Sequence, residues 1–233
     1  MPRMASAKYE IYLESGKKRT FACAIDWPGW CRSGKTADDA IAGLLAHGER
    51  YARVTRSANV RFSPPSDTDQ LKITEKLKGN ASTEFGIPGA PPKADAAPMD
   101  KRELHRQLKL LESCWRAFDA AAEAARGMKL RIGPRGGGRS LPKIVSHVLE
   151  AEEGYLGGLG AKLPRDGKSS EAATRLRNAV RDALTARVEG RPMAMPRNTK
   201  KPWSPHYFVR RAAWHLLDHA WEIEDRAKPD KTS

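Results

Sequence analysis

The hydrophobic pattern of the first third of the chain begins with a period of two. Residues 8–35 alternate between apolar and polar positions around Gly16-Lys17-Lys18, which predicts a hairpin of two strands. A turn at 27–30 and a short third strand at Cys31-Arg32 follow. The period then becomes helical: the Thr36 hydroxyl is placed to cap a helix whose apolar positions keep their spacing to about Thr55.

The next stretch, residues 56–99, has no sustained period. Leu71-Lys72-Ile73-Thr74 predicts one more strand, and the Pro and Gly residues after it predict a loop or linker. The expected organisation is therefore an αβ domain at 1–78, a linker at 79–99 and a helical domain at 100–233.

From Asp100 onward the chain repeats apolar residues at helical spacing in four segments. The first is the clearest, with a seam made by Leu104, Leu108, Leu111, Trp115, Phe118 and Ala122. The second helix begins after Ser140, the third runs from about Ser170 to Val188, and the fourth runs from Ser204-Pro205 to about Arg226. Four amphipathic helices predict a four-helix bundle, so the fold class is α+β.

Composition narrows the class of protein. The mean hydropathy is −0.64 and no run approaches 18 apolar residues, so a membrane span is not expected, and the N-terminus lacks the apolar segment of a signal peptide. Cys23, Cys31 and Cys114 follow no disulfide-framework spacing, which agrees with a reducing compartment. We therefore expect a cytoplasmic protein.

The net charge of +14 permits an anionic partner. Basic residues are nevertheless scattered among acids, no block of five Lys or Arg occurs, and no nucleic-acid-binding motif has the required spacing. A solvated basic surface is the favoured interpretation, and nucleic acid is an unlikely partner.

The strongest candidate chemistry is a histidine pair in the last helix. His215 and His219 lie one helical turn apart, on a stripe that also contains Phe208, Ala212 and Ile223. Neutral imidazole is a common metal ligand, so the pair predicts part of a divalent metal site. The alternative is a pair of buried, hydrogen-bonded core histidines.

Two further features accompany this pair. His147 lies on the flank of the second helix, and small residues continue its stripe at Ala151, Gly154 and Gly158, which suggests close packing or a pocket. The segment from Arg135 to Arg139 contains three glycines before a helix start; it is either a flexible connector or a site for an anion.

Residues 8–55 resemble the HicB-like antitoxin fold, a small β-β-β-α sandwich. The matching segments are Asp26-Trp27-Pro28-Gly29, Gly34-Lys35-Thr36 and Asp39-Ala40. The resemblance implies a module that engages a partner chain. The family joins this module to a DNA-binding segment, and no segment of this chain matches one.

Residues 100–227 resemble the DinB/YfiT superfamily of metal-binding four-helix bundles, which includes thiol-dependent transferases. The likeness rests on two segments, Lys143-Ile144-Val145-Ser146-His147-Val148-Leu149-Glu150-Ala151-Glu152 and Arg211-Ala212-Ala213-Trp214-His215-Leu216-Leu217-Asp218-His219-Ala220-Trp221-Glu222. In that superfamily one His of the second helix and an H-x-x-x-H pair of the last bind the metal. The resemblance therefore implies His147, His215 and His219 as ligands.

Three imidazoles with open positions are typical of a catalytic metal site. Zinc or nickel suits these ligands best, with manganese or iron possible. Asp218, Glu222 and Glu150 are the candidate outer partners of the rings, and Glu150 is the only candidate general base.

The expected function is a metal-dependent transferase that uses a low-molecular-weight thiol, or a hydrolase, acting on a small-molecule substrate. Two alternatives remain open: a partner-binding, antitoxin-like protein with a structural metal, and a stress-associated protein. The apolar residues Trp214, Leu217 and Trp221 on the other side of the last helix make a homodimer possible.

Overall fold

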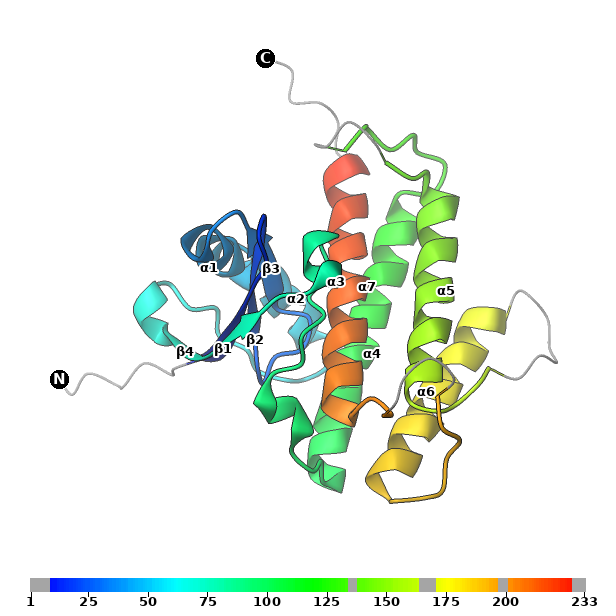
Figure 1. The fold of residues 1–233 in the computed structure, drawn as a ribbon. Coiled ribbons are helices and arrows are strands. Elements are labelled where there is room, and N and C mark those ends of the chain that lie inside the picture. The colour runs from blue at the N-terminus through cyan, green and yellow to red at the C-terminus, as the bar shows by residue number, and fades with distance from the viewer. Residues whose placement is uncertain (1–8, 134–137, 164–170, 197–200, 228–233) are drawn as a thin grey trace, which may run out of the picture. The chain divides into compact units, whose positions relative to one another are not determined.

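The computed structural model describes residues 9–133, 138–163, 171–196 and 201–227. The chain divides into two compact units, Met1–Ala97 (unit 1) and Pro98–Ser233 (unit 2). Unit 1 contains a four-stranded sheet and unit 2 is helical (Figure 1), so the α+β class predicted from the sequence is confirmed.

The sheet of unit 1 has the strand order β3-β2-β1-β4. The predicted hairpin is confirmed, because β1 (Tyr9–Ser15) and β2 (Thr20–Ala24) are antiparallel neighbours, and β3 (Cys31–Gly34) pairs with β2. The later strand β4 (Leu71–Lys78) is longer than expected and runs parallel to β1.

The expected helix after Thr36 is divided in two, α1 (Ala37–Ala46) and α2 (Gly48–Arg56). Thr36 caps α1 as predicted: its hydroxyl accepts from the Asp39 N–H at 3.1 Å. The break follows from Gly48, a weak helix former that packs closely on Pro64, where an added Cβ would lie 3.1 Å from the proline Cβ.

The segment expected as a linker belongs to unit 1 as far as Ala97. It contains the short helix α3 (Ala81–Glu84) and a 3₁₀ turn at Lys93–Ala96. A buried carboxylate, Glu14 of β1, explains why this segment is ordered on the sheet: it accepts hydrogen bonds from the Thr83 hydroxyl and from the backbone N–H groups of residues 89 and 90. A linker was expected because this contact joins residues about 70 positions apart.

Cys23 and Cys31 form a disulfide between β2 and β3. No sequence pattern predicts this disulfide, because the two residues are identified as direct cross-strand partners only once the strand register is known. The spacing of the cysteines thus did not reveal this pair, whereas Cys114 is a buried free thiol.

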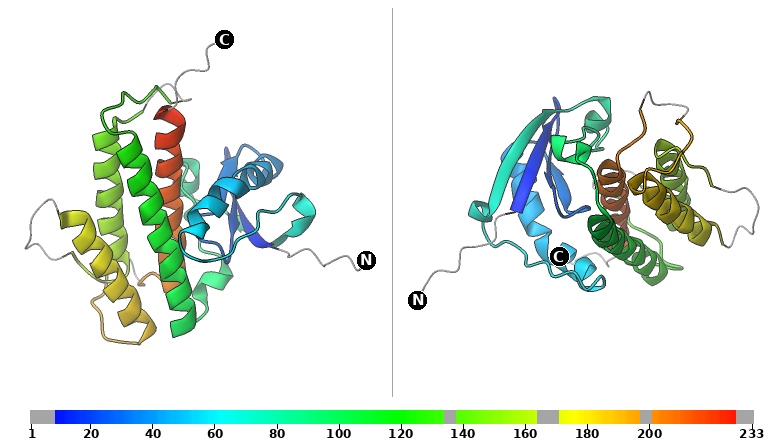
Figure 2. Two further views of the ribbon diagram at one scale, coloured as in Figure 1. Left: turned by 180° about the vertical axis from the view of Figure 1, so that it is seen from behind. Right: turned by 90° about the horizontal axis from the view of Figure 1, so that it is seen from below.

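Unit 2 is built from α4 (Lys101–Ala124), α5 (Leu141–Gly158), α6 (Ala172–Val188) and α7 (Pro205–Ala227), the four helices of its described part. The helix α7 packs against α4 and α5, and α6 packs against all three others (Figures 1 and 2). Each predicted helix is present within a few residues of its expected start. Residues 134–137 of the expected glycine segment lie outside the described ranges.

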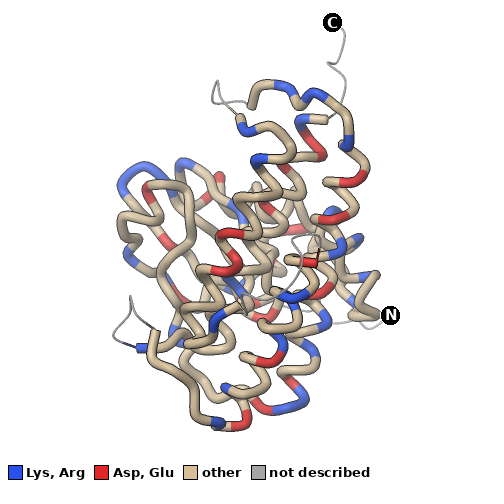
Figure 3. Tube along the Cα trace, turned by 90° about the vertical axis from the view of Figure 1, so that its right-hand side faces the viewer, with Lys and Arg blue, Asp and Glu red and all other residues tan. Residues whose placement is uncertain are grey.

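The charged residues of both units are interspersed (Figure 3). Basic residues are scattered among acidic residues along the helices of unit 2, as expected from the sequence. In the part of the chain that the structure describes, no helix has the length and apolar character needed to cross a bilayer.

Candidate metal centre

Three histidines from two helices meet inside unit 2. His147 comes from α5, and His215 and His219 come from α7, where their spacing of four residues points both rings to one side. One ring nitrogen of each lies within 4.8 Å of the others. The structure therefore brings together the three residues that the DinB/YfiT resemblance named.

The cluster lies mostly below the surface. His215 is 6% exposed and His219 is 8% exposed, whereas His147 is half-buried and forms the accessible side. The rings of His147 and His215 have centroids 5.1 Å apart, and those of His215 and His219 are 4.6 Å apart at 90°. At these distances and angles, one nitrogen of each of the three rings faces a common point between them.

The spacing of these nitrogens fits a shared ion. His215 Nε2 and His147 Nε2 are 3.3 Å apart, and two nitrogens bound at about 2.1 Å to one tetrahedral zinc lie about 3.4 Å apart. Within the described residues, the buried Nδ1 of His215 has no hydrogen-bond partner. A buried polar atom that the chain does not satisfy needs an explanation. An ion held at Nε2 would not contact Nδ1, so the fit to an ion rests on the nitrogen spacing.

The surroundings keep two of the rings in the metal-binding state. Burial, together with the neighbouring His219 and His147 rings, lowers the pKa of His215 to about 2. Burial and the Arg139 guanidinium also lower the pKa of His147. Neutral imidazoles therefore face the centre at physiological pH, and protons do not compete there with a cation.

A carboxylate orients the third ring. His219 Nδ1 donates to Glu222 Oε2 at 2.8 Å, so the proton of this ring is on Nδ1 and the Nε2 lone pair is free to bind an ion. The hydrogen bond from His219, aided by Arg226, lowers the pKa of Glu222 and keeps it ionised. Of the three acids that the sequence offered as outer partners, Glu222 is the one in contact with a ring.

Arg226 extends this chain of contacts. Its Nη1 donates to Glu222 Oε1 at 2.7 Å, and its other nitrogens donate to the carbonyl oxygens of Arg131 and Arg139. Arg226 is 6% exposed, and it ties α7 to the segment before α5. It therefore holds Glu222 against His219.

Cationic and aromatic groups flank the cluster. The Arg211 guanidinium lies 5.3 Å from the Tyr155 ring centre and 5.1 Å from that of Trp214, and the Tyr155 ring lies 5.7 Å from His215. Trp203 packs beside Tyr155, with ring centres 5.6 Å apart. Two guanidiniums, Arg139 and Arg211, each lower the pKa of His215, so the region next to the histidines is electropositive.

Two other predicted features are less directly connected with the centre. Glu150 is exposed and accepts from the Ser146 hydroxyl at 2.8 Å, which turns one of its oxygens toward its own helix. Gly154 and Gly158 line a cavity of about 380 Å³, and the Trp203 ring fills the space beside Gly158. The histidines are not among the described residues that line this cavity.

Tyr155 and Arg211, which flank the histidines, were not expected at this site. Arg211 lies four residues before His215, and Tyr155 lies eight residues after His147, so helical spacing places each on the side of a predicted ligand. Once His147 and His215 are taken as ligands, this spacing is enough to predict that Tyr155 and Arg211 lie beside the metal centre. Arg139 has no such signal, because it precedes α5 in a loop.

Compared with protein-family models, with curated proteins and with solved structures, the chain matches none. The two resemblances thus rest on their motifs, and the function is argued from the site.

Proposed function

We propose that unit 2 is a divalent-metal-dependent enzyme of the DinB/YfiT type, in which His147, His215 and His219 hold one ion. The observation that carries the proposal is the convergence of three ring nitrogens within 4.8 Å in a buried position. Zinc or nickel suits three imidazoles, and manganese or iron is also compatible. The reaction is a thiol-dependent transfer or a hydrolysis on a small molecule.

The bound ion would supply a nucleophile at neutral pH, either hydroxide or the thiolate of a low-molecular-weight thiol. The protein's own charges favour both, because Arg139 and Arg211 add positive potential beside the rings of His147 and His215, whose pKa values are lowered. An anion is therefore stabilised in the open positions.

The chain's other residues have distinct parts in this proposal. Glu222 and Arg226 fix the His219 tautomer. Tyr155 is held under the Arg211 guanidinium, and burial raises the pKa of its phenol, so its hydroxyl is protonated and is available as a hydrogen-bond donor to substrate. No carboxylate of the described chain touches His147 or His215, so Glu150 stays only a candidate base.

The first test is metal content. Protein purified without an affinity tag should contain, or bind on addition of Zn²⁺ or Ni²⁺, about one ion per chain, as measured by elemental analysis and calorimetry. His215→Ala and His219→Ala should each abolish binding. His105→Ala removes an exposed imidazole of α4 and serves as the matched control.

Circular dichroism shows whether each variant remains helical. Failure of folded wild-type protein to bind either ion would overturn the proposal. So would full binding by both His215→Ala and His219→Ala, which would leave only the interpretation as core histidines.

A structural metal in a partner-binding protein is the second candidate, and the deep burial of His215 and His219 favours it. The two candidates differ after removal of the ion. A structural site predicts loss of helicity on chelation, as in zinc domains that fold with their metal. An enzyme centre predicts an apoprotein that stays folded. It also predicts that the spectrum of the Co²⁺-loaded protein changes when added thiol or azide replaces a solvent ligand.

The proposal includes a cytoplasmic setting, where disulfides are rare. The Cys23–Cys31 pair, a disulfide in the structure, would then be held reduced in the cell. Alkylation of an acid-quenched cell extract followed by mass spectrometry counts the free thiols, and a quantitative disulfide in that sample would contradict the setting.

A further inference from the structure

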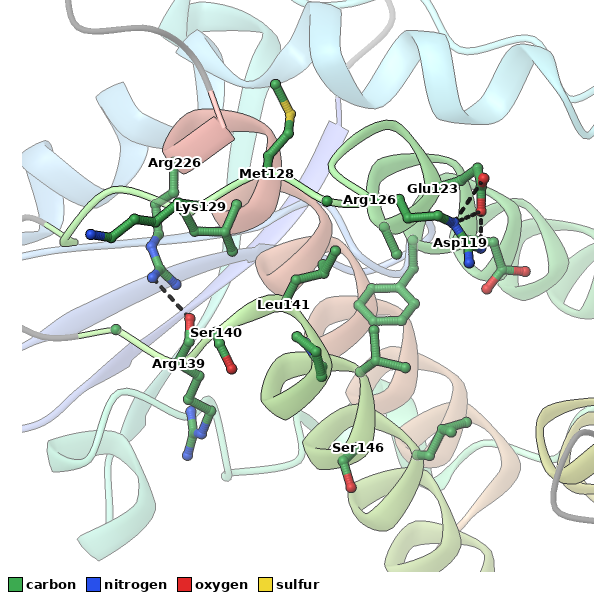
Figure 4. Close-up of a pocket in the computed structure, with 18 residues that line it drawn as sticks. Asp119, Glu123, Arg126, Met128, Lys129, Arg139, Ser140, Leu141, Ser146 and Arg226 are labelled. Atoms are coloured by element: carbon green, nitrogen blue, oxygen red, sulfur yellow. Dashed lines mark hydrogen bonds and ion pairs between the residues drawn. The ribbon is translucent and has the colours of Figure 1, made fainter.

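A second cavity of unit 2 lies where α4 ends and α5 begins. Its volume is about 1060 Å³, at the upper end of the range for small-molecule sites. The lining comes from the last turns of α4, the segment that follows, the first turns of α5 and Arg226 of α7 (Figure 4). Its described lining residues include no histidine, although Arg139 and Arg226 belong both to this lining and to the surroundings of the metal centre.

Apolar side chains supply the larger share of the inner surface of the cavity. Leu141 points toward its middle (Figure 4), and further apolar side chains come from Phe118, Ala122, Leu130, Val145 and Leu149. The segment that closes one side also leaves large apolar residues uncovered: Met128 is 50% exposed and Ile132 is 78% exposed. Apolar surface left open around a cavity is typical of a ligand site.

The charges of the lining are not balanced. Glu123 is paired with Arg126, Asp119 with Arg177 and Arg226 with Glu222. Lys129 and Arg139 remain, and no acid within the described ranges pairs with either. Figure 4 shows both on the opposite side of the cavity from Glu123 and Arg126. The cavity thus has an apolar interior with two uncompensated cations at one side.

We propose that this cavity binds an amphipathic carboxylate of the fatty-acid type. The alkyl chain lies against Leu141, Val145 and Phe118, and the carboxylate lies at the rim between Lys129 and Arg139. The volume accommodates a long chain, the apolar interior selects against a small polar anion, and the two cations select against a cationic or neutral head group. This site does not depend on metal binding by the histidines.

Calorimetry with the full chain and sodium dodecanoate, below its micelle concentration, tests the proposal. We expect saturable binding of one molecule per chain. Affinity should rise roughly fourfold for each methylene from octanoate to dodecanoate, as each leaves water. Dodecanol should bind more weakly, and dodecyltrimethylammonium most weakly.

Paired variants locate the site. Ala122→Trp fills the cavity and should abolish binding, whereas Ala120→Trp places the same ring on the exposed face of α4 and should not. Lys129→Glu with Arg139→Glu should weaken dodecanoate about tenfold and leave dodecanol unchanged. Arg102→Glu, an exposed charge reversal near the start of α4, is the control.

Circular dichroism confirms that each variant is folded. Non-saturable uptake, unchanged binding in Ala122→Trp, or equal binding of dodecanoate and dodecyltrimethylammonium would overturn the proposal. Metal content measured on the same samples keeps this result distinct from that for the histidine centre.

Discussion

Glu14 in unit 1 and the histidine cluster in unit 2 are both buried polar centres. The described chain supplies hydrogen-bond partners for both oxygens of Glu14, but it leaves one nitrogen of the histidine cluster without a partner. Glu14 is 0% exposed, and both of its oxygens accept hydrogen bonds from the segment 83–90. His215 is nearly as buried, but its Nδ1 has no partner among the described residues. A polar group that its own chain satisfies stabilises the fold, whereas one left incomplete indicates a partner from outside.

The largest effect is expected from removing the satisfied group. Glu14→Ala leaves the Thr83 hydroxyl and two backbone N–H groups without their acceptor, which should lower the free energy of unfolding by about 3–5 kcal/mol. Urea unfolding of the full chain measures the change. The exposed Glu49→Ala is the control, with about 0.5 kcal/mol at most. A loss below about 1 kcal/mol for Glu14→Ala would remove the contrast between the two centres.

Glu152 of α5 is a second incomplete group in unit 2. Its Oε1 accepts from Trp115 Nε1, while its Oε2 has no partner in the described part of the chain. Burial raises its pKa from an ordinary 4.5 to about 7. Between these values the folded state holds a proton that the unfolded state has lost, so the contribution of Glu152 is full below pH 4.5 and is lost as the pH rises through 7.

Glu152→Gln should therefore be more stable than the wild type at pH 8.5, by up to roughly 3 kcal/mol, and nearly equal to it at pH 4.5. Urea unfolding at both pH values gives the difference. The neighbouring exposed residue supplies the control Glu153→Gln, which should follow the wild type. Parallel stability of Glu152→Gln and the wild type across this range would show that the carboxyl is solvated.

The sequence predicted what local spacing determines. The Thr36 cap, the four helices of unit 2 and the convergence of His215 with His219 depend on spacing within one element, and the hairpin depends on two strands joined by a short turn. These features appear at their expected positions because period and capping chemistry act within one element.

What the sequence missed depends on contacts between separate elements, even where the residues are as close along the chain as Cys23 and Cys31. The register that pairs Cys23 with Cys31 and the acceptor role of Glu14 each require another strand or segment to be in place. His147 was joined to the other histidines only by a family resemblance, since 68 residues separate it from His215. The sequence offered Asp218, Glu222 and Glu150 as equally good hydrogen-bond partners for the histidine rings, and the structure shows that Glu222 contacts one.

An intermediate effect is expected at the carboxylate that completes His219. Glu222→Gln keeps the shape but removes the charge that orients the ring, so the affinity for Zn²⁺ should fall about 10–100-fold. Competition with a chromophoric chelator measures it. Glu224→Gln, an exposed acid on the same helix, should retain wild-type affinity. Equal affinity in both variants would mean that His219 is oriented by packing alone.

The smallest effect is expected at two helix starts, where the same contrast recurs. The Thr36 hydroxyl accepts from the Asp39 N–H, whereas the exposed Ser140 at the start of α5 makes no side-chain capping bond. Thr36→Ala should therefore cost about 1 kcal/mol of unfolding free energy, and Ser140→Ala only a few tenths. Urea unfolding of the two variants and of the double variant gives both values and their additivity. A larger loss for Ser140→Ala would mean that α5 is capped in solution, so that the start of this helix is completed by its own chain as fully as that of α1.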